Sequence, residues 1–588
     1  MKKNKTMIFL FILPTVLCLL FMYVYPVVRT VIMSFFKVES LTATTSTWSF
    51  YGLQNYFKIL RNAGFISSMK NMVMIWLVGG IITMCLSMLM AVILTSGIRG
   101  AKFFKAAIYM PNIISAVALA TMWIQYVFNY DYGLLNQIVK AFGGENVRWL
   151  GTDLIFWAMM IAFIFGSVGY YMLIFISGIE GIPQDLYEAA TIDGANIFDR
   201  FFQITLPLLK GVIRTCVTFW SINATTFFLW TKMFSPINTE TATIVPVVYL
   251  YDTVFGGKGV VERDAGAGAA VGVVLTLIII AVYVITNLIL KDSDLEYSGR
   301  RAVMGKYHDR INWKKELRLL PGYIIVCAWV ALTAAILFWI VCASLSSTKE
   351  ILTGRVMDFS NGLKWDNYVT AWNTQNVSLY FFNSLVYAIV SCVGVLLISA
   401  PGAYVLSRWK FVGGKAIRIG LVIAMSVPTI MIIMPLYSLA VQWGIKGRVL
   451  LVVLYIMLRV PYTTIYLLDF FSSLSRSYEE AAYIDGCSHS RTFWQIMLPL
   501  VQPAIITVTI FNFMSVWNEF FMALIFTTSD SMTPVGVGLL QIVNAMKYSG
   551  QYGAMFAAVI IVFLPTFLLY LFLSEKIIVG ATSGGVKG

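Results

Sequence analysis

Charged residues are scarce in this sequence: they occupy 12% of its 588 positions, whereas hydrophobic residues occupy 59%. A soluble globular chain has about a quarter of its residues charged, so this composition excludes an ordinary soluble domain. The mean hydropathy is +0.80. The chain is therefore predicted to be an all-α membrane protein that crosses the bilayer many times.

Residues that bind metals or form disulfides are also few. The seven cysteines are scattered, mostly within apolar runs, and no two form a CxxC pair. The two histidines, His308 and His489, lie on separate polar segments. The sequence therefore favours neither a disulfide framework nor a zinc site, and we expect no metal.

Signatures of catalysis are missing as well. The sequence contains no GxxxxGK[ST] phosphate loop, so we expect no ATP hydrolysis by this chain alone. No paired carboxylates or nucleophile–base pair indicates another reaction. We predict that the chain is not an enzyme.

The net charge is +14, yet no basic, aromatic-rich soluble face is present to bind nucleic acid. Lysines and arginines gather instead in four short segments between apolar runs: 2–5, 99–105, 291–318 and 408–418. Under the positive-inside rule these segments face the cytoplasm.

Twelve apolar runs are long enough to cross a bilayer core of about 30 Å. The first begins at Met7 after a basic start and has no cleavage site, so we expect an uncleaved span over residues 7–28. The others are centred near residues 72–95, 106–128, 154–177, 207–230, 267–290, 319–343, 382–407, 416–440, 449–470, 503–527 and 554–575.

These runs divide into six and six around a basic stretch, residues 291–318, which carries eight lysines and arginines and reads as a linker. We predict a first membrane domain over 1–290 and a second over 319–588. An even number of spans in each half gives both halves the same orientation, so they form a parallel repeat with the N- and C-termini in the cytoplasm.

A polar repeat supports this duplication. Residues 188–209 read EAATIDGANIFDRFFQITLPLL and residues 480–501 read EAAYIDGCSHSRTFWQIMLPLV, with 12 of 22 positions identical. Weaker echoes precede them: Asn55-Tyr56 matches Asn367-Tyr368, and Asn71 matches Asn383, at an offset of 312. The offset falls to 292 at the polar repeat, which places about 20 extra residues in the outer loop 129–153.

Each polar copy predicts a helix, a turn and a second helix at the cytoplasmic surface. Gly194 and Gly486 suit a helix stop with left-handed backbone. Pro207 and Pro499 suit the first turn of the next helix. Such a rigid knob, joined to a membrane span, is suited to mechanical coupling with a soluble partner.

The pattern EAA, three residues, G, nine residues, I, one residue, LP resembles the coupling loop of binding-protein-dependent ABC importer permeases, and both copies satisfy it. Other stretches, such as GLQNYF, WDNYVTAW, AYVLSRWKFVG and SVWNEFFMALIF, are similar to the carbohydrate (maltose-type) branch. The resemblance covers nearly the whole chain apart from the linker. The departure is that two permeases, usually separate chains, are fused.

The resemblance implies two six-helix permease repeats of the type I importer fold in the cell membrane. It implies sugar delivery by an extracytoplasmic solute-binding protein, and alternating access driven by two cytoplasmic ATP-binding subunits that hold ATP-Mg, with no cofactor in this chain. It assigns ATPase coupling to ten residues of the repeat: Glu188, Ala189, Ala190, Asp193, Gly194, Glu480, Ala481, Ala482, Asp485 and Gly486. The alternative is a 6+6 secondary sugar carrier, for which acids within the spans are scarce.

Polar groups within spans are costly and are candidates for a substrate path. A sugar needs hydrogen-bonding groups and an aromatic face, which these residues offer: Trp220, Asn223, Asn512, Trp517, Asn518 and Glu519. Arg459 is a further intramembrane charge, although it could pair with Asp469. Glu519 could instead lie at the outer interface, and the tryptophans could be interfacial anchors.

Overall fold

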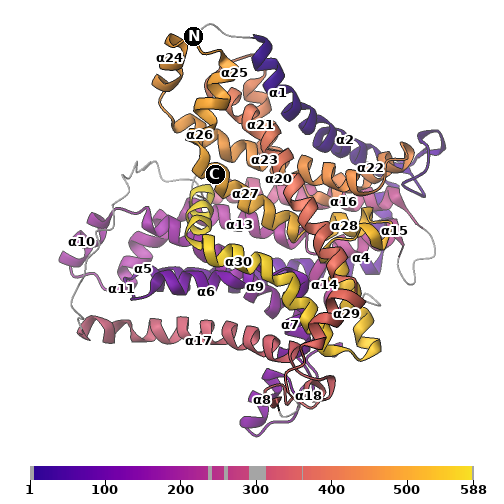
Figure 1. Cartoon of the computed structure of the whole chain (residues 1–588), viewed down its shortest axis with the longest axis vertical. Coiled ribbons are helices and arrows are strands. Elements are labelled where there is room, and N and C mark those ends of the chain that lie inside the picture. Colours follow the sequence, from indigo (N-terminus) through magenta and orange to yellow (C-terminus); the bar gives the residue numbers. More distant parts are fainter. Residues whose placement is uncertain (1–4, 236–240, 257–262, 291–312, 360–361, 586–588) are drawn as a thin grey trace. The chain divides into compact units, whose positions relative to one another are not determined.

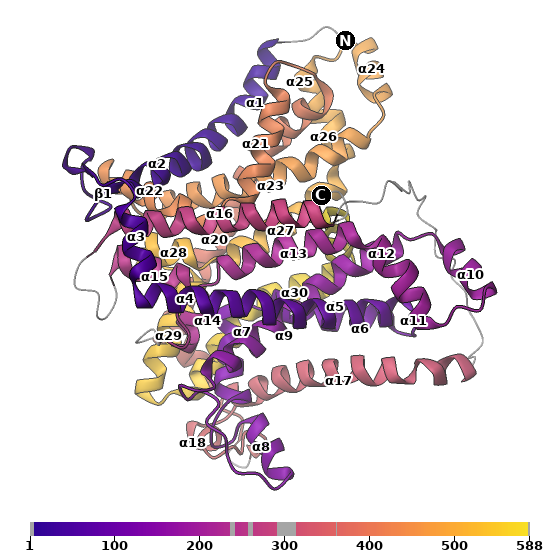
Figure 2. The same ribbon diagram turned by 180° about the vertical axis from the view of Figure 1, so that it is seen from behind.

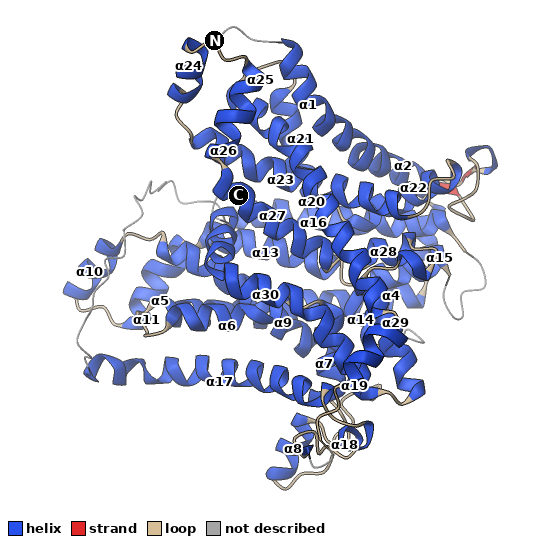
Figure 3. Cartoon of the chain, in the orientation of Figure 1, coloured by secondary structure: helices blue, strands red, loops and turns tan. Residues whose placement is uncertain are grey.

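The computed structural model describes residues 5–235, 241–256, 263–290, 313–359 and 362–585. Helices form most of this part of the chain (Figure 3). Two short strands, β1 (Phe36–Lys37) and β2 (Ser49–Phe50), pair antiparallel with Phe36 opposite Phe50. The prediction of an all-α membrane protein is confirmed, with this one small ladder added.

The chain divides into two compact units, and each unit contains residues from both halves of the sequence. Unit 1 comprises residues 1–68, 244–276 and 372–542. Unit 2 comprises residues 69–243, 277–371 and 543–588. The predicted division into a first membrane domain, 1–290, and a second, 319–588, describes the repeat in the sequence and stays a prediction. Most of that linker lies outside the described residues, and helix α17 begins at Trp313.

The helices of unit 1 are α1 (Lys5–Leu19), α2 (Tyr25–Ser34), α3 (Gln54–Arg61), α15 (Pro246–Phe255), α20 (Val377–Arg408), α21 (Gly414–Ser426), α22 (Thr429–Gln442), α23 (Arg448–Ser473), α24 (Ser477–Ile484), α25 (His489–Thr492), α26 (Leu498–Leu500), α27 (Gln502–Trp517) and α28 (Phe521–Phe526). Those of unit 2 are α5 (Gly80–Thr95), α6 (Ala101–Ile113), α7 (Ala116–Met122), α8 (Leu134–Ala141), α9 (Ile155–Glu180), α10 (Gln184–Ile192), α11 (Ile197–Arg200), α12 (Leu206–Leu208), α13 (Lys210–Thr225), α14 (Leu229–Phe234), α17 (Trp313–Ser344), α18 (Thr348–Leu352), α19 (Asp366–Val369) and α30 (Tyr552–Gly585).

Three helices have residues in both units: α4 (Ala63–Met74), α16 (Ala265–Ile289) and α29 (Val535–Ser549). Short π-helical turns continue several helices: η1 (Leu20–Val24), η3 (Ile75–Gly79), η4 (Trp123–Val127), η5 (Phe201–Thr205), η7 (Thr370–Thr374) and η8 (Phe493–Met497). Two 3₁₀ turns are η2 (Thr45–Thr47) and η9 (Asp530–Met532).

Unit 1 holds the first span of the first half against the core of the second half. Figures 1 and 2 both show α1 and α2 beside α21 and α22. The Thr15 hydroxyl donates to the carbonyl of Ile398 on α20 at 3.1 Å. The Tyr23 hydroxyl donates to the carbonyl of Leu458 on α23 at 2.9 Å. Polar side chains on an apolar helix therefore fix its register against its neighbours.

In unit 2 the arrangement is reversed: α17 and α30, the first and last spans of the second half, pack against helices of the first half. The Tyr570 hydroxyl on α30 donates to the carbonyl of Ala106 on α6 at 2.8 Å. The ring of Trp329 on α17 stacks on Phe165 of α9 with centroids 5.2 Å apart. The first and last spans of each half thus pack against the middle spans of the other.

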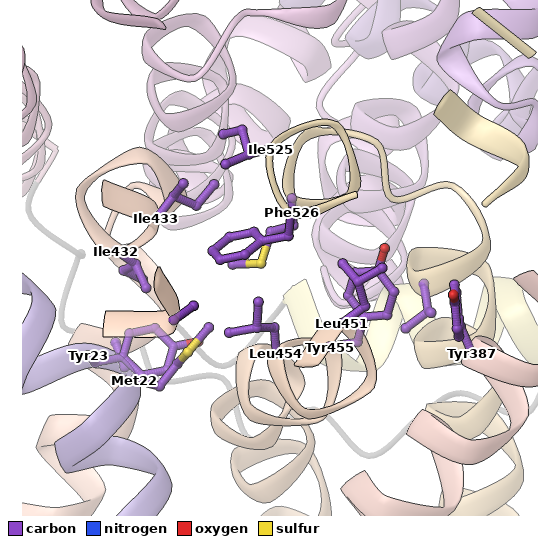
Figure 4. Packing of buried hydrophobic residues seen from close by; sticks show 14 of the residues in the cluster. Met22, Tyr23, Tyr387, Ile432, Ile433, Leu451, Leu454, Tyr455, Ile525 and Phe526 are labelled. Atoms are coloured by element: carbon purple, nitrogen blue, oxygen red, sulfur yellow. The ribbon is translucent and has the colours of Figure 1, made fainter. Parts of the chain in front are cut away.

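The core of unit 1 is a cluster of aliphatic and aromatic side chains (Figure 4). Met22 and Tyr23 from the first half lie in it beside Leu454 and Phe526 from the second half. Burial of large apolar side chains contributes about 1.5–3 kcal/mol each relative to full exposure. The cluster therefore holds the exchanged helix by packing as well as by hydrogen bonds.

Eight described helices are long and apolar enough to cross a membrane as single spans. Three more pairs qualify only as bent spans, with bends of 98° between α6 and α7, 99° between α21 and α22, and 76° before α27. The spans expected near 106–128 and 416–440 are therefore present only as bent helix pairs. The run expected near 207–230 contains α13, a helix of 16 residues followed by a turn and α14.

The echo of Asn55 and Asn367 has a structural basis. The Asn55 amide donates to the carbonyls of Ser34 and Phe36 at 2.9 and 2.8 Å. In unit 2 the Asn367 amide donates to the carbonyls of Ser344 and Ser346, both at 2.9 Å. Each asparagine pins the chain where it leaves the first span of its half.

Glycines stand at the same place in both units because nothing larger fits. A Cβ atom at Gly266 would lie 2.4 Å from the Phe36 carbonyl oxygen, and one at Gly553 would lie 2.4 Å from the Asn367 amide nitrogen. The sixth span of each half therefore approaches this asparagine turn closely. The duplication is preserved in atomic detail and not only in residue names.

The second repeated pair, Asn71 and Asn383, also makes matching hydrogen bonds in the two units. The Asn71 amide donates to the carbonyls of Thr241 and Ala242 at 3.1 and 3.2 Å. The Asn383 amide donates to the carbonyls of Ser531 and Thr533 at 3.0 and 3.1 Å. Both asparagines tie the second span of a half to the segment that precedes its last span.

Candidate functional sites

The two polar copies fold into the same turn. We name residues 184–209, in unit 2, the first loop and residues 477–501, in unit 1, the second loop. The predicted left-handed glycines are confirmed, with φ of +81° at Gly194 and +76° at Gly486. The N–H of Ala195 donates to the Ala190 carbonyl at 2.9 Å, and that of Cys487 donates to the Ala482 carbonyl at 2.9 Å.

These bonds are the i to i−5 bonds of a Schellman stop, which satisfies carbonyls that the ending helix leaves open. A Cβ atom at either glycine would meet nothing within 4 Å. The glycine is therefore required by backbone conformation and not by crowding.

A capped short helix follows each turn. In the first loop the Asn196 side chain accepts from the N–H of Phe198 and of Asp199, at 2.8 and 3.0 Å. In the second loop the Ser488 hydroxyl accepts from the N–H of Arg491 at 3.3 Å. Capping residues fix the direction of the second helix relative to the first.

The sequence predicts both prolines in the first turn of the next membrane helix, and this is wrong: they lie just before it, in three-residue helices that continue η5 and η8. Pro207 occupies the first turn of α12, and Pro499 occupies the first turn of α26. Both short helices lead after one non-helical residue into α13 and α27. Each loop is thus connected to a long helix through a pre-organised turn.

The loops differ in how much of their side-chain surface is covered. In the first loop Glu188, Ala189, Asp193 and Gly194 are exposed, and Ala190 is partly buried. In the second loop Glu480, Ala481, Asp485 and Gly486 are exposed, whereas Ala482 is buried. Phe493 and Met497 of the second loop are fully buried among residues of α1, α20 and α23.

A buried ion pair anchors the second loop. The Arg408 Nε atom at the end of α20 lies 3.1 Å from Oε1 of Glu479, and each side chain is about 5% exposed or less. An Arg408 Nη2 atom also donates to the Leu474 carbonyl at 3.0 Å. A charge pair removed from water holds its geometry strongly because either partner alone would be left uncompensated.

The first loop has no charge at the matching position, where Tyr187 stands. The hydroxyl groups of Tyr187 and Thr205 lie 2.9 Å apart in a hydrogen bond. At the end of α9, before the loop, Lys105 and Glu180 form a 2.8 Å ion pair that is partly exposed. The first loop therefore depends on weaker and more solvated contacts.

Arg408 and Glu479 are functional candidates that sequence reasoning missed. The only signal was the doubled glutamate at 479–480, of which the first is buried and the second exposed. The ion pair joins residues 71 positions apart, so no local spacing indicates it.

Two of the predicted substrate-path residues lie in unit 2. Trp220 is buried, and its indole N–H donates to the Trp76 carbonyl at 2.9 Å. The Asn223 amide donates to the Tyr171 hydroxyl at 3.0 Å. A Cβ atom at Gly80 would lie 2.5 Å from the Trp220 indole nitrogen, so Gly79 and Gly80 leave room for this ring.

The other four lie in unit 1. Asn512 is buried and its amide donates to the Thr463 hydroxyl at 2.9 Å. Trp517 is buried against the ring of Phe513, with centroids 5.7 Å apart. Asn518 and Glu519 follow in the turn between α27 and α28. The six candidates thus fall into two groups, one in each unit.

Glu519 has a definite structural partner. Its carboxylate accepts from the N–H of Met522 at 2.7 Å and of Ala523 at 3.1 Å, which caps α28. Its electrostatic neighbours are Tyr455 and Arg459. Arg459 lies close enough to Glu519 and Tyr23 to feel their charges, and Asp469 is not among the groups that act on it. A role in the substrate path stays a prediction for all six residues.

Within the described residues, no group of three or more histidine, cysteine or acidic side chains is placed to hold a metal ion. Many apolar spans, an internal duplication and two copies of one exposed loop define a multi-pass membrane transport component. The chain belongs to the family of binding-protein-dependent transport system inner membrane components. The model of that family matches residues 84–293 and again residues 394–574.

Membership in this family implies an ATPase and a substrate-binding protein as partners. The chain is 30% identical over 265 residues to the diacetylchitobiose uptake system permease protein NgcG of Streptomyces coelicolor, covering 45% of this chain and 87% of that protein. It is 32% identical to the arabinooligosaccharides transport system permease protein AraP of Halalkalibacterium halodurans, covering 49% and 88%.

It is also 34% identical to the trehalose/maltose transport system permease protein MalF of Thermococcus litoralis, covering 37% of this chain and 74% of that protein. Each of these relatives is therefore matched over most of its own length by less than half of this chain. This ratio agrees with two permease units joined in one chain.

Proposed function

We propose that this chain is the fused transmembrane permease of an ATP-driven saccharide importer in the cell membrane. The observation that carries the proposal is the pair of loops with one Schellman turn, at Gly194 and Gly486, each leading into a long helix. The saccharide class is supported by the relatives, whose names include diacetylchitobiose, arabinooligosaccharides and trehalose/maltose.

The two loops are the proposed sockets for two ATP-binding subunits. The chain has no phosphate loop of its own, so ATP-Mg is held by those partners. Closure of the ATPase pair displaces both loops, and the rigid turns pass the movement to α13 and α27. The exposed groups Glu188, Asp193, Glu480 and Asp485 are the proposed contact residues.

The proposed orientation places both loops and both chain termini in the cytoplasm. The basic segments at 2–5, 99–105 and 408–418 support this because positively charged residues stay on the cytoplasmic side. The solute-binding protein then delivers the saccharide to the opposite face. Trp220 and Asn223 in unit 2, with Asn512, Trp517, Asn518 and Glu519 in unit 1, are the proposed polar groups of the path.

The test is uptake by proteoliposomes that contain the chain, its ATPase and its solute-binding protein. We expect ATP-dependent saccharide uptake, and we expect Gly194→Pro to abolish it while leaving membrane insertion intact. Proline cannot adopt the positive φ of this position, so the loop loses its turn. Glu480→Lys reverses an exposed charge of the second loop and should have the same effect.

Two outcomes contradict the proposal. One is normal uptake and normal ATPase binding by both variants. The other is uptake by the lone chain, driven by an ion gradient without ATP, which would make the protein a secondary carrier.

A further inference from the structure

Unit 2 contains a cavity of about 550 Å³ near α8 and α18, which lie side by side in Figures 1 and 2. Its walls come from the end of the bent third span, the α8 segment, the end of α17 and the turn after α18. Its lining includes Tyr126, Gln137, Trp339, Arg355, Met357 and Asp358. Cavities that bind small molecules have volumes of about 300–1,000 Å³.

One wall is a fixed aromatic stack. The rings of Tyr126 and Trp339 are 4.4 Å apart at an angle of 15°. Tyr132 stacks on the same tryptophan at 6.2 Å and 16°. These rings hold each other in place, so the wall is pre-organised and loses little freedom when a ligand binds.

The turn after α18 and the side chain of Gln137 make the rest of the lining polar. Arg355 and Asp358 are exposed, and the described residues include no ion-pair partner for either side chain. The Gln137 amide donates to the Tyr132 carbonyl at 3.0 Å, which leaves the amide oxygen of Gln137 as an acceptor. The cavity thus offers a donor, two acceptors and no net charge.

The polar part of the lining is also built to stay in place. Gly354 has a φ of +72°, and a Cβ atom there would lie 2.7 Å from Cβ of Tyr132. Glu350 closes a capping box on Ser347 at the start of α18, accepting from its N–H at 2.7 Å. The turn that carries Arg355 is therefore held against the aromatic stack on one side and by a capped helix on the other.

The matching place in unit 1 is constructed differently. Trp339 lies five residues before Ser344, and Arg29 lies five residues before Ser34. Arg29 extends between the rings of Tyr25 and Trp48, at 5.9 and 5.4 Å from their centroids. Unit 1 thus places its own guanidinium between aromatic rings, whereas unit 2 has an aromatic wall beside a cavity.

We propose that this cavity is a saccharide-binding site, separate from the proposed substrate path, that takes one or two rings of a neutral sugar. Hydroxyl groups of a sugar both donate and accept, which suits Arg355, Asp358 and the Gln137 oxygen. Its C–H surfaces suit the exposed side chain of Met357, whereas the buried rings of Tyr126 and Trp339 only back the site. The outward position of the site rests on the orientation given under the proposed function, but binding itself does not require the ATPase.

The experiment uses the purified full chain in lipid nanodiscs, without ATP or partners. Titration calorimetry is run with maltose, trehalose, diacetylchitobiose and arabinotriose. We expect saturable binding of at least one of them, weakened ten-fold or more by Asp358→Asn and by Arg355→Gln. Glu145→Gln, an exposed acid of the same outer segment that does not line the cavity, is the matched control and should bind as the parent does.

Each other outcome overturns the site. Absence of binding by all four sugars does so, and so does binding that both variants leave unchanged at an unaltered melting temperature. Loss of solute-binding-protein affinity in Asp358→Asn, with sugar affinity intact, would assign the surface to protein docking instead. ATP-driven uptake by the parent complex is measured in parallel, so failure of the site is distinguished from failure of the proposed function.

Discussion

The first and second loops have one sequence pattern and one turn, yet the surrounding protein holds them differently. The second loop is anchored by a buried ion pair, Arg408 with Glu479, and by the buried ring of Phe493. The first loop exposes Ile197 and Phe198, with 68% and 73% of their surface accessible. Duplication has therefore preserved the surface offered to a partner more strictly than the attachment behind it.

The shape of the turn and the attachment of the loop to the rest of the protein therefore meet different requirements. The turn must have one shape in both loops because it presents the shared residues EAA, ID and G. The attachment only needs to transmit force, which an ion pair, a hydroxyl pair or packed rings all do. Both loops leave large apolar side chains exposed, such as Ile192 in the first loop and Ile484 in the second, which is typical of a surface that a partner covers.

The largest effect is expected for Arg408→Ala, which tests whether the ion pair anchors the second loop. It leaves the Glu479 carboxylate buried without its cation, which we expect to destabilise the second loop by about 3–5 kcal/mol. The measurement is thermal unfolding in detergent together with limited proteolysis at residues 474–490. The double variant Arg408→Met with Glu479→Gln removes both charges and should recover most of the loss. Equal proteolysis of parent and single variant would show that the pair is not an anchor.

The same substitution at Gly194 and Gly486 tests whether the two turns are equally important. We expect Gly194→Ala and Gly486→Ala to cost about 1–2 kcal/mol each, because both positions are left-handed and open to solvent. Affinity for the ATPase should fall by a similar factor in both, roughly 5- to 30-fold. Ser490→Ala, an exposed change in the second loop, is the control. A large loss in one loop alone would mean that the two turns are not used alike.

The smallest effect is expected for Lys105→Gln, which removes the ion pair with Glu180 beside the first loop. The Glu180 side chain is 45% exposed, so solvent screens the pair and the loss should be at most about 1 kcal/mol. The melting temperature is compared at low and high salt, and the difference from the parent should shrink at high salt. A loss as large as that of Arg408→Ala would remove the contrast between the loops.

The sequence predicted the helical class, the duplication and the turn because each is written in local patterns. Gly194 and Gly486 need left-handed backbone, which depends on neighbours in the chain. Asn55 and Asn367 were visible only as a repeat, because their amides bond to carbonyls 19 to 23 positions away.

The bends and the ion pair could not be predicted in this way. The run near 106–128 is apolar on average, so mean hydropathy does not register the 98° break after Ile113, although Pro111 and Asn112 directly precede it. Arg408 and Glu479 meet only because α20 and α24 are brought together by packing. The exchange of first and last spans between the halves is likewise a property of contacts between residues hundreds of positions apart.

That exchange has a consequence for the order of synthesis. Thr15 bonds to the carbonyl of Ile398, a residue that emerges 383 positions later. At about 5–20 residues per second, α1 waits in the membrane roughly 20–80 s before its partner exists. Unit 2 likewise lacks the hydrogen bond from Tyr570 to the Ala106 carbonyl until 464 further residues have been made. Neither unit can therefore complete its packing until spans from both halves have been made.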